Sequence, residues 1–242
     1  MISLTVGLPM YRSKKIAWLA MESLVNQKNI DFEWELIIAE EKCDLFGEDN
    51  IRKYEELLKK VGCVSIKYIP LEDRISLSVK WRLLALSSDS NSRCFVIQSS
   101  DDYSSPNRLK NSLIMMDNGI DWIRNKKMIF YNFNDKSLYL LDLPNDVTTG
   151  GEMAVRTSII RNIPYFKKYK HVDSWLFNSC KKINNKLKTD IGIGDGWRYS
   201  LHSYGMNNIS KRDFKKKYKK MTKYVLSDIV PGNISLAIKN LK

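Results

Sequence analysis

Short apolar segments alternate with amphipathic ones through the first half of this chain, and this alternation limits the fold more than any other feature of the sequence. The segments with the length and character of strands are residues 2–9, 32–41, 63–70 and 93–100. The segments with a helical spacing of apolar side chains are residues 13–27, 50–62, 76–88 and 106–119. Strands separated by helices are typical of an α/β sheet with crossover connections. We therefore predict one α/β domain with a mixed, mostly parallel central sheet flanked by helices.

The second half of the chain is more irregular. Its pattern predicts a hairpin over residues 127–141, a glycine turn leading into a strand at 148–156, a helix at 173–186 and a strand at 196–203. Two helix starts have recognisable signals. Ser13 is expected as the N-cap of the first helix, and the pair Ser105 and Pro106 as the N-cap and first residue of the fourth.

Composition bounds the class of protein. The chain has 242 residues, of which 43% are hydrophobic, enough for one large domain with a packed core. No stretch reaches the roughly 18 apolar residues of a membrane span, and the N-terminal charges follow the apolar run, opposite to a secretory signal. The four cysteines have no C-x-x-C spacing, which argues against a zinc site or a disulfide framework. We expect a cytoplasmic protein.

The formal net charge of +13 is the second compositional signal. Such a charge raises the local concentration of anions, which include nucleotides, nucleic acid and acidic lipid head groups. The sign of the charge does not choose among them. The protein could therefore be cytoplasmic and also bind peripherally to an anionic surface such as a membrane.

An acidic pair follows the fourth predicted strand in the stretch QSSDDYSSP, residues 98–106. Asp101 and Asp102 could be acids that precede a helix and favour the positive end of its dipole. A second acidic strand end, Glu40 and Glu41, is expected at the same edge of the sheet, where open α/β sheets bind their ligands. Two acidic loops on one edge indicate a site that holds a divalent cation and a polyhydroxylated ligand through oxygen atoms.

The two histidines, Asp173 and a glycine pair are further positions to interpret. His171 lies in an exposed turn, whereas His202 ends an alternating strand and could complete a manganese or magnesium site beside the carboxylates. Asp173 begins a predicted helix, where it could act as an N-cap or as a general base facing the pocket. The pair at 150–151, which includes Gly151, makes a turn or lets the backbone approach a ligand closely.

The order of these segments resembles that of family 2 glycosyltransferases of the GT-A fold over about residues 2 to 212. The resemblance rests on the stretches SLTVGLPMYRSKKIAWLAMESLVNQ, WELIIAEE, SVKWRLLAL, FVIQSSDDYSSPNRL, TTGGEMAVR, HVDSWLFNS and LHSYGMNNIS. It implies a GT-A domain over residues 1–210, followed by a basic helical extension over residues 211–242 packed on or beside it. The Q-x-x-R-W motif of processive polysaccharide synthases is missing from the sequence, which favours transfer of a single sugar.

The resemblance also implies which residues bind the nucleotide-sugar donor. They are Pro9, Met10, Tyr11, Arg12, Glu40, Lys80, Ser99, Ser100, Asp101 and Gly151. Pro9, Met10 and Tyr11 would line the base pocket. Glu40 would contact the nucleoside, and Lys80 would lie near the diphosphate.

The metal and the base are assigned in the same way. The family's D-x-D-D pattern places its last two acids on Asp101 and Asp102 and its first on Ser99, which leaves an uncharged contact at that position. Asp101 and His202 are the expected ligands of Mn²⁺ or Mg²⁺, and Asp173 matches the acid that removes a proton from the acceptor hydroxyl. The resemblance favours inversion at the anomeric carbon. A UDP-sugar is our first choice of donor, and the acceptor could be a glycan, a lipid-linked molecule or nucleic acid.

Two other classes of function fit parts of the sequence. The basic stretch KRDFKKKYKKMTKY, residues 211–224, would suit a nucleic-acid-binding module without transferase activity. In helical form, Phe214, Tyr218 and Met221 would make an apolar ridge flanked by cations. A glycosyltransferase acting on a modified DNA base would reconcile both signals. A nucleotidyltransferase that forms sugar nucleotides is less consistent, because the stretch GLPMYRSKK lacks the glycine-rich loop of that class.

Overall fold

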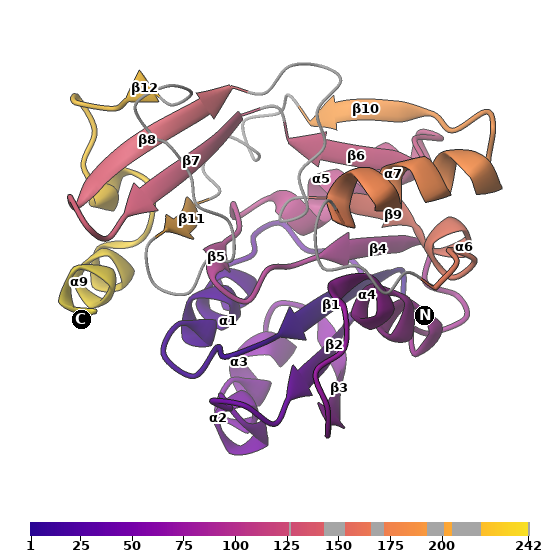
Figure 1. The fold of residues 1–242 in the computed structure, drawn as a ribbon, viewed down its shortest axis with the longest axis horizontal. Coiled ribbons are helices and arrows are strands. Elements are labelled where there is room, and N and C mark those ends of the chain that lie inside the picture. Colours follow the sequence, from indigo (N-terminus) through magenta and orange to yellow (C-terminus); the bar gives the residue numbers. More distant parts are fainter. Residues whose placement is uncertain (126, 143–152, 166–171, 193–200, 205–218, 242) are drawn as a thin grey trace.

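The computed structural model describes residues 1–125, 127–142, 153–165, 172–192, 201–204 and 219–241. In these residues the strands form two sheets, a seven-stranded one in the order β10-β6-β9-β4-β1-β2-β3 and a five-stranded one in the order β12-β8-β7-β11-β5 (Figure 1).

The large sheet contains β1 (Leu4–Met10), β2 (Trp34–Glu41), β3 (Cys63–Leu71), β4 (Cys94–Ile97), β6 (Trp122–Asn125), β9 (Ala154–Arg156) and β10 (Thr189–Gly192). The small sheet contains β5 (Asp102–Tyr103), β7 (Lys127–Asn132), β8 (Ser137–Asp142), β11 (Leu201–Tyr204) and β12 (Lys219–Lys220). The helices are α1 (Ala17–Val25), α2 (Glu48–Arg52), α3 (Glu55–Lys59), α4 (Leu77–Leu86), α5 (Arg108–Asp117), α6 (Thr157–Ile160), α7 (Val172–Ile183), the 3₁₀ helix η3 (Leu226–Asp228) and α9 (Gly232–Asn240).

The four predicted strands of the first half are confirmed and lie together in the large sheet. β1 pairs in parallel with β2 and with β4, and β2 pairs in parallel with β3. β9 is antiparallel to both of its neighbours, β4 and β6, so the sheet is mixed and mostly parallel as predicted. Because parallel strands end at one edge, the loops after β1, β2 and β4 meet there.

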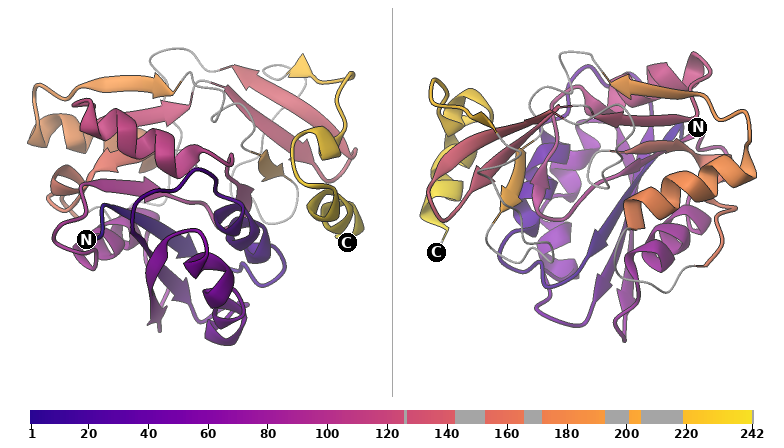
Figure 2. Two further views of the ribbon diagram at one scale, coloured as in Figure 1. Left: turned by 180° about the vertical axis from the view of Figure 1, so that it is seen from behind. Right: turned by 45° about the horizontal axis from the view of Figure 1, so that its top comes forward.

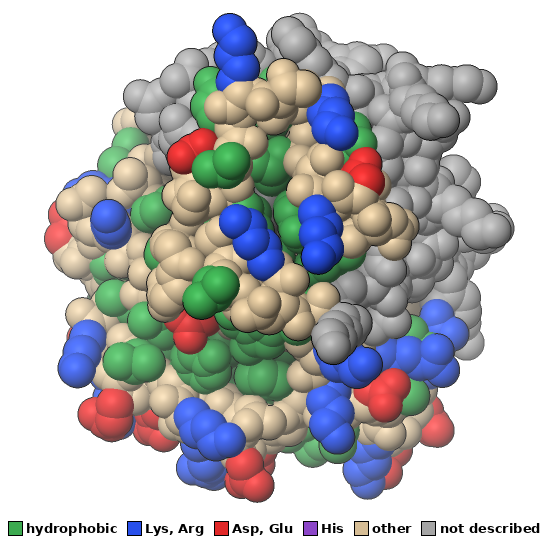
Figure 3. Space-filling view, turned by 90° about the vertical axis from the view of Figure 1, so that its left-hand side faces the viewer, with side chains coloured by type: hydrophobic (Ala, Val, Ile, Leu, Met, Phe, Trp, Pro, Cys, Tyr) green, Lys and Arg blue, Asp and Glu red, His purple; other side chains and the backbone are tan. Residues whose placement is uncertain are grey.

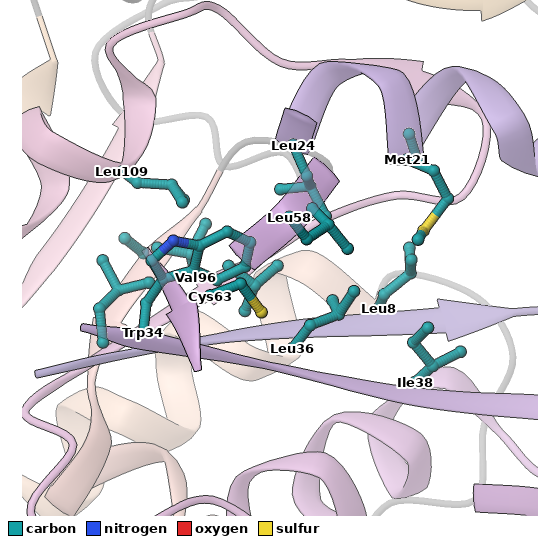
Figure 4. Close-up of a cluster of buried hydrophobic side chains, with 14 of the residues drawn as sticks. Leu8, Met21, Leu24, Trp34, Leu36, Ile38, Leu58, Cys63, Val96 and Leu109 are labelled. Carbon is teal, nitrogen blue, oxygen red and sulfur yellow. The ribbon is translucent and has the colours of Figure 1, made fainter. Parts of the chain in front are cut away.

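Apolar side chains leave the strands toward both faces of the large sheet, because successive residues of a strand point in opposite directions. On one face, Leu8, Leu36 and Ile38 pack with Met21 and Leu24 of α1, as Figure 4 shows. The other face is covered by a second cluster with contributions from α4, α6 and α7. Figure 1 shows α4 and α7 in front of this sheet, and the view from behind in Figure 2 shows α5 on the opposite face. A sheet buried on both faces explains the nearly unbroken apolar runs.

The small sheet links the C-terminal part of the chain to the N-terminal part. The predicted hairpin is confirmed as β7 and β8, and β12 extends it along the free side of β8. A separate core joins Tyr131 of β7 to Leu19 of α1 and to Ile234 and Ile238 of α9. The C-terminal segment from β12 to α9 therefore shares a core with the first helix.

Several local predictions are wrong. The single helix expected over residues 50–62 is divided into α2 and α3, because the chain tightens into a turn at Lys53 and Tyr54. The first and fourth helices begin at Ala17 and Arg108, a few residues after the predicted caps. The helix expected over residues 211–224 does not continue through Lys219 and Lys220, which form β12 instead. Residues 211–218 lie outside the described part of the chain.

Across the described ranges, no helix is both long enough and apolar enough to cross a membrane.

Candidate functional site

The carboxyl edge of the large sheet brings the sequence-predicted residues of β1, β2 and β4 together. Met10 is in register with Glu40, and the backbone N–H of Gln98 donates to the carbonyl of Gly7 at 3.0 Å. The ends of β2 and β4 therefore lie on either side of the end of β1. In Figure 1 the arrowheads of β1 and β4 point toward the small sheet. The prediction that both acidic strand ends occupy one edge is confirmed.

Lys80 of α4 reaches this edge and is buried there. Its ammonium lies 2.7 Å from the Glu41 carboxylate and donates to the Met10 carbonyl at 2.8 Å. The side chains of Lys80 and Glu41 are only 4% and 3% exposed. Burial lowers the pKa of Lys80, and the hydrogen bond to Glu41 acts in the opposite direction. The pair fixes the end of β1 to the end of β2.

The Tyr11 ring is the centre of a cationic cluster just beyond β1. The guanidinium carbon of Arg74 lies 4.5 Å from the ring centroid, that of Arg12 lies 5.2 Å away, and the Lys80 nitrogen lies 5.7 Å away. Arg12 is exposed and has a positive φ of 51°, so the chain turns sharply there. An aromatic face with three cations suits a ligand that combines a ring with phosphates. Arg74 is not predicted as a site residue from the sequence, because its position in the loop before α4 carries no motif.

Glu40 and Glu41 have different surroundings, because neighbouring residues of a strand face opposite sides of the sheet. The Glu40 carboxylate accepts hydrogen bonds from the backbone N–H groups of Phe46 and Gly47, at 2.7 and 3.0 Å, and from the Tyr68 hydroxyl at 3.0 Å. These bonds hold the segment after β2 in place. The contact expected between Glu40 and the nucleoside stays a prediction.

Both carboxylate oxygens of Glu40 accept hydrogen bonds from the protein, whereas only one oxygen of Glu41 does so in the described part of the chain. One carboxylate oxygen of Glu41 accepts from Lys80 and, at 3.1 Å, from the backbone N–H of Ile75. The other oxygen is buried and has no hydrogen-bond partner among the described residues. A buried acceptor without a donor is costly unless a ligand or water supplies one. Glu41 is therefore a candidate ligand contact. The sequence contained a signal for this, because Glu40 and Glu41 must face opposite sides of the sheet and only one of them can face Lys80.

The loop after β4 is held from beneath by a buried polar network. The Gln98 side-chain amide donates to the carbonyls of Ser99 and Asp102, both at 3.0 Å. The fully buried Arg108 guanidinium donates to the Gln98 side-chain oxygen at 2.9 Å and to the Ser104 hydroxyl at 2.7 Å. This network fixes the path of the backbone that carries the acidic pair.

A hydroxyl contact joins this loop to the end of β1. The Ser13 hydroxyl accepts from the Tyr11 backbone N–H at 3.1 Å and lies 2.9 Å from the Ser100 hydroxyl. Ser13 was expected to cap the first helix, but its side chain holds two loops of the site together. Ser99 and Ser100 are both partly exposed at the same edge.

The acidic pair is adjacent to the strand that carries His202. Asp102 begins β5, which pairs antiparallel with β11, and Asp102 and His202 face each other in the register. Asp101 is partly exposed, whereas Asp102 is buried. The His202 side chain lies outside the described part of the structure. Among the described side chains, no group of three or more His, Cys, Asp or Glu residues could hold a metal ion.

Asp173 lies in the first turn of α7 and is partly exposed. α7 leads through residues 184–188 into β10, which runs parallel to β6 and in the same direction as β4. The chain leaves α7 at the edge where β10 starts, so α7 begins toward the opposite, carboxyl edge. Gly151 and His171 lie outside the described residues.

Comparison with known proteins identifies the fold. No family model and no curated protein matches this sequence. Among solved structures, S. aureus TarS in complex with UDP-GlcNAc is similar with a TM-score of 0.64 and 15% identity, over 86% of this chain and 60% of that one. A longer TarS structure gives a TM-score of 0.63 and 16% identity, over 84% of this chain and 37% of that one.

A mannosyltransferase from Pyrobaculum calidifontis, PcManGT in complex with GDP-Man and Mn²⁺, gives a TM-score of 0.59 at 11% identity, over 83% of this chain and 56% of that one. This chain thus matches between 37% and 61% of the length of the TarS chains. At such low identities the similarity establishes the fold alone. The chain has the mixed α/β GT-A fold that its sequence predicted.

Proposed function

We propose that this protein is a glycosyltransferase that moves a single sugar from a nucleoside diphosphate sugar, with a UDP-sugar as first choice, to a hydroxyl acceptor. The observation that carries the proposal is the cationic aromatic cluster around Tyr11 at the carboxyl edge of the sheet. That edge is where open α/β sheets bind nucleotides. TarS was solved with UDP-GlcNAc and PcManGT with GDP-Man, and both have this fold.

The donor would bind through its base and its diphosphate. Tyr11 would offer aromatic surface to the base, while Arg74 and Arg12, whose guanidiniums lie over its ring, would attract the phosphates. Lys80 would contribute by holding the end of β1 in place through its bonds to Glu41 and to the Met10 carbonyl, because its charge is already paired with that of Glu41. The unpaired oxygen of Glu41 can accept from an N–H of the base or from a ribose hydroxyl. The expected contacts of Pro9, Met10 and Ser99 belong to the same proposal.

A divalent cation fits the donor groups present. Asp101 offers carboxylate oxygens, and the pairing of β5 with β11 brings the backbone of His202 beside Asp102. Carboxylate and imidazole are suitable ligands for Mn²⁺, and carboxylate is suitable for Mg²⁺. Asp101 and His202 would hold the ion, which, when bound, would neutralise charge that develops on the departing diphosphate.

Asp173 would accept the proton of the attacking hydroxyl. Its carboxylate is partly exposed, on a helix that begins toward the nucleotide edge. A base of this kind accelerates transfer by about 10²- to 10⁴-fold. Attack by the acceptor oxygen on the face of the anomeric carbon opposite the diphosphate would invert its configuration. The new glycosidic bond forms as the bond to the diphosphate breaks.

A panel of nucleotide sugars, tested by thermal shift with and without Mn²⁺, examines the proposal directly. A donor at 100 times its Kd stabilises the folded state by about 2.7 kcal/mol. For a chain of this size that corresponds to a rise in Tm of roughly 5–10 °C. We expect the largest rise with UDP-sugars and a smaller one with free sugars. A flat response across UDP-, GDP-, CDP- and ADP-sugars would refute a donor site.

A further inference from the structure

A recess lies between the β7–β8 hairpin and the C-terminal segment, and it is lined by none of the residues described above at the nucleotide edge. It has a volume of about 350 Å³. Its lining residues are Tyr131, Lys136, Ser137, Leu138, Lys220, Met221, Thr222, Tyr224, Val225, Leu226 and Lys239. We call it the hairpin cleft. Figure 3 views this side of the molecule, where exposed Lys and Arg side chains stand around apolar ones.

The residues that line the hairpin cleft carry a net positive charge. Three of its lining residues are lysines and none is acidic. Lys136, Lys220 and Lys239 are all exposed, and none forms an ion pair within the described part of the chain. Three like charges around one recess repel each other, so an anion bound between them would stabilise the arrangement.

Separate elements bring these lysines together. Lys136 occupies the hairpin turn with a positive φ of 52°, and Lys220 belongs to β12, opposite Tyr139 of β8. Lys239 lies in the last turn of α9, where the helix dipole favours a cation in any case. The helix dipole does not explain the positions of Lys136 and Lys220, which are not in a helix. The tertiary structure brings these two lysines to the same recess.

The cleft also offers an aromatic surface. The Tyr224 side chain is 53% exposed at the rim, whereas Tyr131 is buried. The apolar residues Leu138 and Leu226 are buried beneath, and hydroxyls come from Ser137 and Thr222. An exposed aromatic ring beside unpaired lysines is the combination with which proteins bind single strands, because bases stack on the ring while cations follow the backbone.

We propose that the hairpin cleft binds single-stranded nucleic acid, with the three lysines on successive phosphates and Tyr224 stacked on a base. The sequence supports an extended polyanion, because residues 211–220, whose last two residues form β12, carry seven Lys or Arg and one Asp. A planar bilayer fits this site less well, because the charges line a recess. The proposal does not depend on transferase activity, and its test contains no nucleotide sugar.

The test is binding of the full chain to a labelled oligodeoxynucleotide of about 16 nucleotides, the upper end of single-strand site sizes, across a salt series. One variant carries Lys136→Gln, Lys220→Gln and Lys239→Gln. The control variant carries Lys60→Gln, Lys182→Gln and Lys186→Gln, three exposed lysines elsewhere that lower the net charge by the same amount. Equal Tm values for both variants and the parent show that each is folded.

Each phosphate contact with a single strand contributes about 0.7 to the slope of log affinity against log salt. The cleft variant should therefore have a slope shallower by about 2 and bind at least about tenfold more weakly at low salt. The control variant should stay close to the parent. Tyr224→Ala should weaken binding by about five- to a hundredfold, and Tyr224→Phe should retain it, because stacking needs only the ring.

Three results would overturn the proposal. The parent could fail to bind the strand at low salt. The control variant could lose as much affinity as the cleft variant, which would assign binding to the overall charge. Anionic vesicles of phosphatidylserine and phosphatidylcholine could bind through the three cleft lysines while the strand does not, which would assign the cleft to a membrane surface instead.

Discussion

Replacing Lys80 by methionine tests whether a buried ion pair holds the nucleotide edge together. Methionine keeps most of the volume of the lysine stem but removes the ammonium. The ammonium serves both the Glu41 carboxylate, at 2.7 Å, and the Met10 carbonyl, at 2.8 Å. In Lys80→Met, Glu41 would keep only the backbone N–H of Ile75 among its observed partners, because its second oxygen already has none among the described residues.

The magnitude follows from burial. With side chains 4% and 3% exposed, water cannot replace the lost partner without a rearrangement of the edge. Breaking a buried pair from one side costs about 3–5 kcal/mol, because an uncompensated charge is left inside the protein. For a domain stabilised by about 5–15 kcal/mol, this is a large fraction of the free energy of unfolding.

Urea unfolding followed by the fluorescence of the six tryptophans measures this free energy. A matched control is Lys42→Met, because Lys42 pairs with Glu72 near the same strand end but with both side chains more than half exposed. That change should cost about 0–1 kcal/mol. The double variant Lys80→Met and Glu41→Gln removes both charges and should recover about 1–2 kcal/mol relative to Lys80→Met alone.

A stabilising role for the buried ion pair would be refuted if Lys80→Met cost no more than Lys42→Met. It would also be refuted if the double variant lost as much as the sum of the two single variants, because the two charges would then act independently.

The remaining predictions concern catalysis and packing. Asp101→Ala should remove the gain in UDP affinity that Mn²⁺ provides and leave the fold intact, and equal affinities with and without chelator in both proteins would contradict a metal role. Asp173→Asn should bind donor normally while kcat falls by about 10²- to 10⁴-fold, and near-parental turnover would leave Asp173 only a favourable charge in the first turn of α7. Gly7→Ala should destabilise the domain by about 1–3 kcal/mol, because its new Cβ would lie 2.3 Å from the Phe95 ring, and Phe95→Leu should relieve part of that loss in chemical denaturation.

The sequence alone determined the α/β class and the common edge of the two acidic strand ends. Both depend on short-range information, because side chains repeat every two residues in strands and about every four in helices. Parallel strands joined by helices then bring their carboxyl ends to one edge. This is why Glu40 and Asp101, about sixty residues apart in the chain, could be placed on the same side.

The contacts of each polar side chain depend on the three-dimensional fold and could not be predicted. Glu40 and Glu41 are the same residue type and are adjacent in sequence. Glu40 nevertheless accepts a hydrogen bond from the backbone of Phe46, whereas Glu41 pairs with Lys80. The short strands β5 and β12 escaped prediction for the same reason, since two residues carry no periodic signal and form a strand only where a neighbour offers backbone partners. Hydrogen bonds and charges depend on distance in space. Repeating patterns report only separation along the chain. They therefore predicted the sheet and its carboxyl edge, but not which polar side chains form hydrogen bonds and ion pairs there.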